Sequence, residues 1–297
     1  MRVPDLIFNL FFQNENQKVR ENIEEKYTEI ITGKRILNPS DDLASTNEIL
    51  NLKNEINKLS QFSRNRLFAD TVLSYADTLL AGIEDRLRSL YATALRAANQ
   101  TLTTDQLTAI GEEFEEALKL LLNTANEKIG NNYIFSGNTL TDKPFDEVTL
   151  DYTAASSGDF TVYIDENYSV STFLDGRGVF GITTSDPAVN NIFKVIKSIA
   201  DKLKNGQSLD STDIENLQKS YEQISKIRAE IGSILKELRN EQVYQETRED
   251  TLEKQKSDVE DTDIAKSISD YERYKLTYDA IMKLFVNHKG LSILDYI

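Results

Sequence analysis

Between residues 69 and 97, apolar side chains recur in alternating steps of four and three residues without a break. The series is Ala69, Leu73, Ala76, Leu80, Ile83, Leu87, Leu90, Ala94 and Ala97. A sustained heptad repeat places these residues on one stripe of a helix and predicts a left-handed coiled-coil seam. A helix over residues 41–98 would be roughly 85–90 Å long at a rise of 1.5 Å per residue. This part of the chain is therefore expected to form a rod.

Later segments of the same chain offer partners for this seam. Thr103 and Gln106 have the spacing of a capping box, and the helix that they begin is predicted to reach Gly130. Further helices are predicted from Asp186 to about Asn205 and from about residue 210 to 260. A short connection makes consecutive helices antiparallel neighbours, so the helix that begins after Thr103 is expected to fold back along the first. This helix and the one over residues 210–260 can fill the seam. The rod seam is predicted at Leu73, Leu80, Ile83, Leu87 and Leu90.

From residue 131 to 185 the spacing of apolar residues changes from the helical period to a period of two residues. Two short runs alternate apolar and polar residues, namely Val148, Leu150 and Tyr152, and then Phe160, Val162 and Ile164. This pattern predicts two strands with a turn between them at residues 156–159. We expect a small, mainly β domain over residues 133–185.

Each end of the chain carries a helix and an interruption. The first helix is predicted to run from Pro4 to Thr32, and the glycine after it can take the left-handed conformation that ends a helix. Ser40 can cap the restarted helix, with two acids in its first turn. A second joint is predicted at residues 260–263, before a final helix. The first joint is predicted to comprise Gly33, Asn38, Pro39, Ser40, Asp41 and Asp42.

The two terminal helices have apolar positions but little partner surface within one chain beyond each other. Isolated helices are marginal in water, so we expect these two to order on assembly with other copies. The predicted assembly positions are Leu6, Leu10, Ile23, Ile30, Ile264, Ile268, Tyr271, Tyr278 and Phe285.

The predicted fold class is mainly α with a small β insert. The expected architecture is an elongated antiparallel helical rod, coiled coil or bundle, with both termini at one end and the β domain at the other. Three domains are predicted: the terminal helices in residues 1–40 with 263–297, a helical rod in residues 41–132 with 186–262, and a β domain in residues 133–185.

Few residues of the chain are of the types that carry chemistry. Cysteine is absent and His288 is the single histidine, so we expect neither a thiolate nucleophile nor a histidine-based triad. Adjacent acids such as Glu112 and Glu113 fit a solvated helix face better than an acid–base pair or a cation site. The formal net charge of −15 argues against nucleic acid as a partner. The sequence therefore predicts no enzyme, no cofactor and no metal site.

The sequence also constrains where the protein acts. It contains no run of 18 apolar residues, so no transmembrane helix and no membrane partner are expected. The apolar stretch at residues 6–12 lacks the small-residue cleavage site of a secretory signal peptide. We expect the protein either to stay inside the cell or to leave by a route without a cleaved signal.

Three segments resemble the flagellin family of bacterial flagellar axial proteins. They are TGKRILNPSDD at residues 32–42, QFSRNRLFADTVLSYADTLLAGIEDRLRSLYATALRAANQTL at 61–102, and DVEDTDIAKSISDYERYKLTYDAI at 258–281, followed by the ending LSILDYI. The resemblance implies a structural subunit, exported by the flagellar type III system without a cleaved signal peptide and located outside the cell in the flagellum. It also implies that the terminal helices pack into concentric tubes around a central channel. One departure from the family pattern is Leu43, where a small residue or proline is more usual.

Within that family, three details favour the branch that forms a ring at the hook–filament junction. They are the start Met-Arg-Val, the segment NNYIFSGNTLTDKPF at residues 131–145, and the ending with LDY in place of a short basic tail. The partners so implied are other copies in a ring, a neighbouring hook-associated protein, flagellin and an export chaperone. Filament flagellin is the alternative interpretation, and a cytoplasmic coiled-coil scaffold is a further one.

Overall fold

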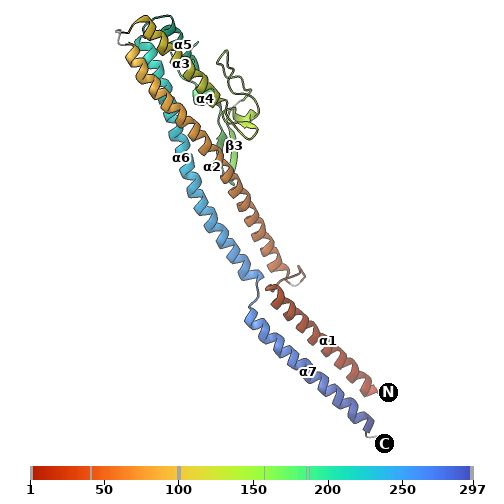
Figure 1. Cartoon of the computed structure of the whole chain (residues 1–297). Helices are drawn as coiled ribbons and strands as arrows, with labels where there is room; N and C mark the ends of the chain where they lie inside the picture. The colour runs from red at the N-terminus through yellow and green to blue at the C-terminus, as the bar shows by residue number, and fades with distance from the viewer. Residues whose placement is uncertain are drawn as a thin grey trace. The chain divides into compact units, whose positions relative to one another are not determined.

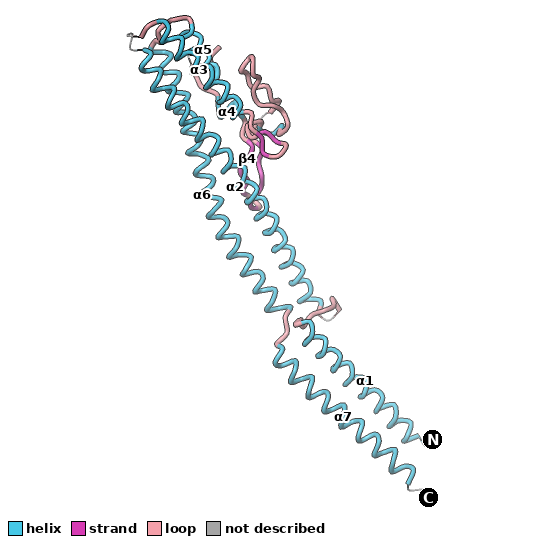
Figure 2. Tube along the Cα trace, viewed as in Figure 1, coloured by secondary structure: helices cyan, strands magenta, loops and turns pink. Residues whose placement is uncertain are grey.

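The computed structural model describes residues 3–40, 42–98, 102–156, 158–184, 186 and 188–294. Its elements are drawn in Figure 1 and coloured by type in Figure 2. In chain order they are α1 (Val3–Thr32), α2 (Leu43–Ala98), α3 (Thr104–Ala125), β1 (Lys128–Ile129), β2 (Asn132–Tyr133), the 3-10 helix η1 (Gly137–Thr139), β3 (Phe160–Asp165), β4 (Tyr168–Phe173), α4 (Gly176–Phe180), α5 (Ile192–Lys204), α6 (Ser211–Glu260) and α7 (Ile264–Leu294). The predicted fold class, mainly α with a small β insert, is confirmed.

The chain divides into two compact units. The terminal unit comprises residues 1–57 and 248–297, and the middle unit comprises residues 58–247. α1 and α7 belong to the terminal unit, the strands and α3 to α5 belong to the middle unit, and α2 and α6 contribute to both. The three-domain division stays a prediction. Across the described ranges, every helix is too short or too polar to span a bilayer.

The core of the middle unit is built on the heptad residues of α2. Ala69, Leu73, Ala76, Leu80, Ile83, Leu87, Leu90, Ala94 and Ala97 are all at most 1% exposed. They belong to one apolar cluster with residues of α3 and α6, including Phe114, Leu121, Leu217, Ile224, Ile231 and Leu238. The seam of α2 is thus covered by helices of the same chain.

Polar contacts at the edge of this seam fix the direction in which α6 runs along α2. Arg66 Nη1 donates to Gln242 Oε1 at 3.2 Å, and Arg88 Nη2 donates to Tyr221 Oη at 3.4 Å. As the residue number rises on α2, the partner number falls on α6, so the two helices are antiparallel.

α3 and α5 approach each other closely because α3 carries Gly111 at their contact. A Cβ built on Gly111 would lie 2.7 Å from Lys204 Cγ, 2.8 Å from Lys204 N and 3.0 Å from the carbonyl oxygen of Ala200. Backbone atoms cannot move aside singly, so no side chain fits at this position without a shift of α5.

The antiparallel β3–β4 hairpin lies against α2 and α6 within the middle unit. Asn65 Nδ2 on α2 donates to the carbonyl oxygen of Tyr163 at 2.7 Å. Gln245 Nε2 on α6 donates to the carbonyl oxygen of Ile164, also at 2.7 Å. The ring of Phe68 on α2 packs against Phe173 on β4. One amide from each helix therefore holds the same strand.

The predicted strand at residues 148–152 is wrong. β3 pairs with β4, which follows it, and not with a preceding strand. Asp146 Oδ1 accepts hydrogen bonds from the backbone N–H groups of Val148 at 2.9 Å and Thr149 at 2.7 Å, which closes a turn at this point. Leu150 has a φ of 59°, outside the β region, and Val148 is 89% exposed.

The helix predicted to reach Gly130 ends earlier, at Ala125. Asn126 Nδ2 donates to the carbonyl oxygen of Phe145 at 3.1 Å, and its Oδ1 accepts from the N–H of Phe145 at 2.9 Å. This side chain ties the end of α3 to a distant loop, and Gly130, with a φ of 61°, lies in the turn between β1 and β2.

The helix predicted from Asp186 begins later, at Ile192. Asn191 is its N-cap, since Asn191 Oδ1 accepts from the N–H of Lys194 at 3.0 Å. Asp186 instead accepts from the N–H of Ala188 at 2.8 Å within a turn. Both residues are of the types that cap helices, which is why the sequence pattern did not separate them.

Candidate functional site

The candidate site is the pair formed by α1 and α7 in the terminal unit, which lie side by side in Figure 1. Phe12 stacks on Phe285 with ring centroids 3.9 Å apart, and Tyr27 lies 6.3 Å from Tyr271. Later residues of α1 thus meet earlier residues of α7, so the pair is antiparallel. Val19, 9% exposed, lies on α1 between these two ring contacts.

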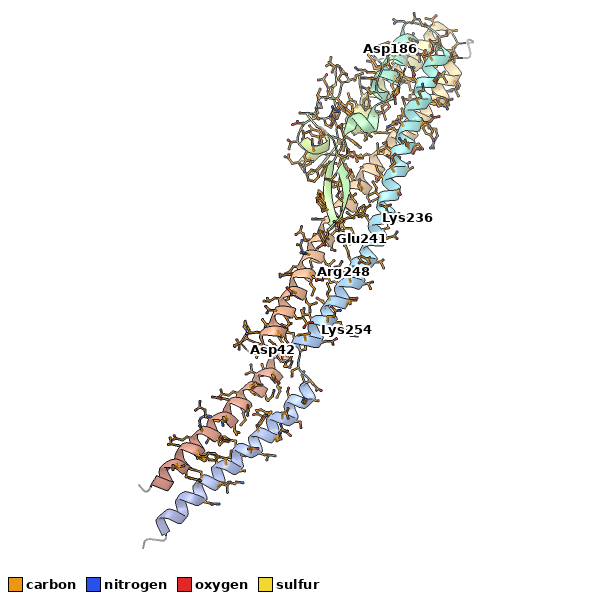
Figure 3. The ribbon with its side chains drawn as sticks, turned by 180° about the vertical axis from the view of Figure 1, so that it is seen from behind. Asp42, Asp186, Lys236, Glu241, Arg248 and Lys254 are labelled. Carbon is orange, nitrogen blue, oxygen red and sulfur yellow. The ribbon has the colours of Figure 1, made fainter. Side chains whose placement is uncertain are left out.

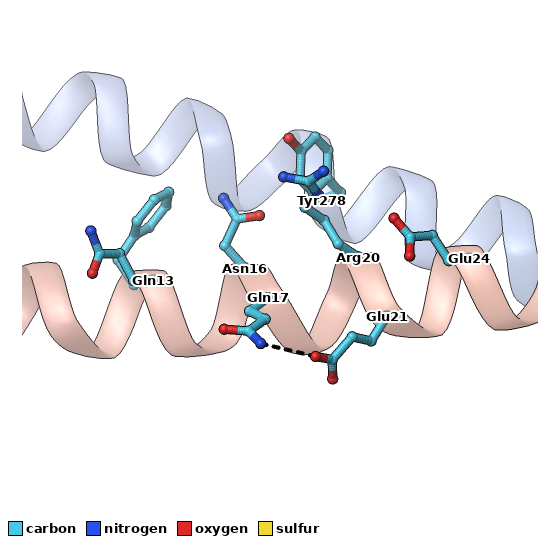
Figure 4. Close-up of a pocket in the computed structure, with 8 residues that line it drawn as sticks. Gln13, Asn16, Gln17, Arg20, Glu21, Glu24 and Tyr278 are labelled. Carbon is cyan, nitrogen blue, oxygen red and sulfur yellow. Dashed lines mark hydrogen bonds between the residues drawn. The ribbon is translucent and has the colours of Figure 1, made fainter. Parts of the chain in front are cut away.

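A groove of about 470 Å³ runs along this pair. Figure 4 shows it with polar side chains of α1 on one side and Tyr278 of α7 on the other. Gln17 Nε2 donates to Glu21 Oε1 at 3.0 Å within it. The groove is lined by Phe12, Gln13, Asn16, Gln17, Arg20, Glu21, Glu24 and Tyr278. Amides and charges dominate, so this face of the pair is hydrophilic.

Other faces of the pair expose large apolar side chains. Of the predicted assembly positions, Leu10 is 58% exposed, Ile264 50% and Ile268 43%. Ile23, Ile30, Tyr271, Tyr278 and Phe285 are partly buried. Leu6 is in α1, but its side chain lies outside the described residues. The remaining exposed apolar residues of the two helices are Ile7, Phe11, Tyr27, Ile31, Leu276, Leu284 and Val286.

A buried acid, Glu29, links α1 to α7. It is 3% exposed, and its Oε2 accepts from Ser267 Oγ at 2.8 Å and from Thr262 Oγ1 at 3.3 Å. Its Oε1 accepts from Lys26 Nζ at 2.7 Å. Burial alone would raise the pKa of Glu29, but the hydrogen bonds from Lys26 and Ser267 outweigh it, and the pKa lies below its ordinary value.

The two predicted joints are hydrogen-bonded to each other. Gly33, with a φ of 70°, ends α1 by donating its N–H to the carbonyl oxygen of Glu29 at 2.8 Å. The N–H of Thr262 donates to the carbonyl oxygen of Gly33 at 2.9 Å, and the N–H of Arg35 donates to the carbonyl oxygen of Glu260 at 2.8 Å. The interruption between α1 and α2 is thus hydrogen-bonded directly to the interruption between α6 and α7.

A second buried acid, Glu260, completes this connection. Its side chain accepts from Lys34 Nζ at 2.8 Å and from Lys53 Nζ at 3.0 Å, and the residue is 5% exposed. Burial would raise the pKa of Glu260, but the two lysines hold it below its ordinary value. One carboxylate thereby joins the end of α6 to the first joint and to α2.

The cap of α2 is Asp42, labelled in Figure 3, rather than the predicted Ser40. Asp42 Oδ1 accepts from the N–H groups of Ala44 at 3.1 Å and Ser45 at 3.2 Å. Its hydrogen bonds with Ser45 hold the pKa of Asp42 below its ordinary value. Asp42 therefore precedes the helix instead of lying in its first turn. Asn38 and Pro39 lie in the same connector, and Asp41 lies outside the described residues.

The five predicted seam residues belong to the core of the middle unit. Leu73, Leu80, Ile83 and Leu87 are fully buried, and Leu90 is 1% exposed. Within the described ranges, His, Asp and Glu side chains form no cluster of three or more that could hold a metal ion. The side chain of His288 is not among those that the structure describes.

Sequence reasoning missed the buried polar residues Glu29, Ser267 and Glu260. Acids in helices are usually solvated, so their identity gave no signal of burial. The positions of the two acids did give a signal of burial. Glu29 precedes the left-handed glycine by four residues, and Glu260 is the first residue of the second joint.

Comparison with known proteins shows which class of protein this chain resembles. Residues 5–139 match the family model of the bacterial flagellin N-terminal helical region. The chain is 27% identical over 290 residues to flagellar hook-associated protein 3 of Escherichia coli strain K12, which covers 90% of this chain and 91% of that protein. It is 25% identical over 283 residues to the protein of the same name in Salmonella typhimurium strain LT2, with 88% and 89% covered.

A solved structure supports the fold. The crystal structure of flagellar hook-associated protein 3 from Legionella pneumophila superposes with a TM-score of 0.62 at 14% identity, over 70% of this chain and 97% of that one. The resemblance to the flagellin family is thus confirmed over residues 5–139, and the chain is similar along most of its length to flagellar structural proteins. Within that class, two curated relatives that it matches over most of their length are each named flagellar hook-associated protein 3.

Proposed function

We propose that this chain is a subunit of the junction between hook and filament, where copies assemble into a ring through α1 and α7. The names of its relatives support a position next to the hook. The role is mechanical, and no catalytic step is part of it.

The observation that carries the proposal is the apolar surface that the paired terminal helices leave exposed. Phe11 is 65% exposed on α1, and Leu276 is 70% and Leu284 67% exposed on α7. Apolar area removed from water stabilises an interface by roughly 25 cal/mol per Å². Exposed apolar patches of this kind mark sites of protein–protein contact. Copies packed lengthwise along this pair would cover them.

The remaining parts of the proposal concern neighbours and location. The ring would contact another hook-associated protein on one side and flagellin on the other, outside the cell. Export would use the flagellar type III system without a cleaved signal peptide. Before export, a chaperone would cover the apolar faces of α1 and α7, because such faces favour aggregation.

Immunogold labelling tests the junction role. Antibody raised against residues 133–185, which include the exposed Val148, is applied to intact and to permeabilised source cells, which are viewed by electron microscopy. Cells in which the gene is deleted serve as the control. Gold confined to the boundary between hook and filament is the expected result.

Two other labelling patterns would contradict the proposal. Gold along the whole filament would make the chain a filament flagellin. Gold inside permeabilised cells, with none on the flagellum, would favour a cytoplasmic coiled-coil scaffold.

A further inference from the structure

The contacts between α1 and α7 are mostly of a kind that does not fix one alignment of the two helices. Phe12 on Phe285, Tyr27 near Tyr271 and the buried Val19 are apolar or aromatic contacts. Such contacts tolerate a helix that slides by one heptad, because apolar residues recur at that spacing along both helices. Something else has to select the observed register.

The polar layer at Glu29 has the required selectivity. Both carboxylate oxygens have donors, with Lys26 on Oε1 and Ser267 with Thr262 on Oε2. The Thr262 and Ser267 hydroxyl oxygens also lie 2.9 Å apart, so the three residues form one closed network. Ser267 is 3% exposed and Glu29 is equally buried, so water does not replace these donors.

A shift of α7 by one heptad would break this network. Tyr274 would then face Glu29 in place of Ser267, and the carboxylate would stay buried without its donors from α7. Burying a charge without its hydrogen bonds is strongly unfavourable, and buried polar residues are known to select register in coiled coils.

We propose that Glu29, with Ser267 and Thr262, determines the register in which α1 pairs with α7. This role concerns the folded chain itself and does not depend on the flagellar function. The hydrogen bond from the N–H of Thr262 to the carbonyl oxygen of Gly33 lies next to this network and would break in the same shift. A substitution of Glu29 leaves that bond in place, so the two contributions can be separated.

Disulfide trapping in the purified full-length chain measures the register, because the natural sequence has no cysteine. Asn16 Nδ2 lies 3.3 Å from Met282 Sδ, so the pair N16C/M282C reports the observed register. The pair I23C/M282C reports the register shifted by one heptad. Each pair is placed in the natural background, in Glu29→Leu and in the matched control Glu25→Leu, which alters an exposed acid of the same helix.

In Glu29→Leu, the I23C/M282C disulfide is expected to form at least ten times more than in the natural background, at equal protein concentration and with monomeric product. Glu25→Leu should match the natural background. If Glu29→Leu still forms only the N16C/M282C disulfide, the apolar contacts and the joint suffice, and the proposal is overturned.

A less disruptive variant tests the proposal if Glu29→Leu fails to fold. Ser267→Ala removes one donor while keeping a residue that favours helix. It should also raise the I23C/M282C product, by a smaller factor. An unchanged product ratio in this variant, with helix content retained, contradicts the proposal in the same way.

Discussion

At the scale of single residues, the terminal unit contains two buried carboxylates that stay charged because specific donors surround them. Glu29 is held by Lys26, Ser267 and Thr262, and Glu260 by two lysines. The pKa of each lies below its ordinary value of 4.5, despite the burial that opposes this. A lowered pKa means that the folded state binds the proton less readily than the unfolded state does.

The terminal unit should therefore lose stability in acid. The contribution of Glu29 and Glu260 to the free energy of unfolding is complete above pH 4.5 and declines as the pH falls below it, through their lower folded-state values. We expect the melting temperature of the terminal unit, followed by far-ultraviolet circular dichroism, to fall on acidification from about pH 6 to about pH 3.

The double variant Glu29→Gln with Glu260→Gln provides the control for this effect. Glutamine cannot ionise, so the variant should melt lower at neutral pH and show a flatter pH dependence. An equally steep dependence in the variant would assign the acid sensitivity to other carboxylates.

The apolar seam makes a second prediction for single residues. Leu80→Ala deletes a fully buried side chain, which costs about 2–5 kcal/mol, and should lower the melting temperature of the middle unit by several degrees. Leu95→Ala, on the same helix but 41% exposed, is the matched control and should change it little. Equal melting temperatures for the two variants would mean that Leu80 is not in a packed seam.

At the scale of elements, the approach of α3 to α5 depends on one glycine. In Gly111→Ala, the new methyl group meets backbone atoms of Ala200 and Lys204, so α5 must move. Overpacking of this kind costs about 1–3 kcal/mol, which exceeds the gain of up to about 1 kcal/mol that alanine brings to a helix. The middle unit should be less stable to urea.

Gly82→Ala is the control, and it is expected to change the stability in the opposite direction. Gly82 lies inside α2, and a Cβ there has no neighbour within 4 Å. Only the helix propensity changes, so this variant should be more stable by up to about 1 kcal/mol. A stabilised Gly111→Ala variant would show that α3 and α5 are not tightly packed.

Elements in which apolar residues recur with a sustained period could be predicted from the sequence. Elements whose ends or turns depend on side-chain hydrogen bonds could not. The heptads of α2 carry a long, unbroken signal, and the capping box at Thr103 and Gln106 is present as predicted. The alternation at residues 148–152 was misleading because the Asp146 side chain closes a turn there. Asn126 likewise ends α3 through a contact with Phe145, nineteen residues away, which no local pattern contains.

At the scale of the whole molecule, the apolar faces of the terminal helices are only partly covered by other residues of the same chain. The sequence already indicated this shortage of partner surface. It did not indicate the stacked rings and the buried acid through which α1 and α7 pair, because those contacts join residues more than 200 positions apart. The pairing buries one side of each helix, and assembly is proposed to cover the rest.

Thiol labelling tests this assembly claim most directly. Single cysteines are introduced as Phe11→Cys on α1, Leu276→Cys on α7 and, as a control, Val148→Cys in the middle unit, all at exposed positions of a chain without cysteine. Maleimide labelling rates are compared between the purified protein and isolated flagella. We predict that labelling of the first two slows at least tenfold in flagella while Val148→Cys is labelled as before. Unchanged labelling of Phe11→Cys and Leu276→Cys would contradict assembly through the terminal helices.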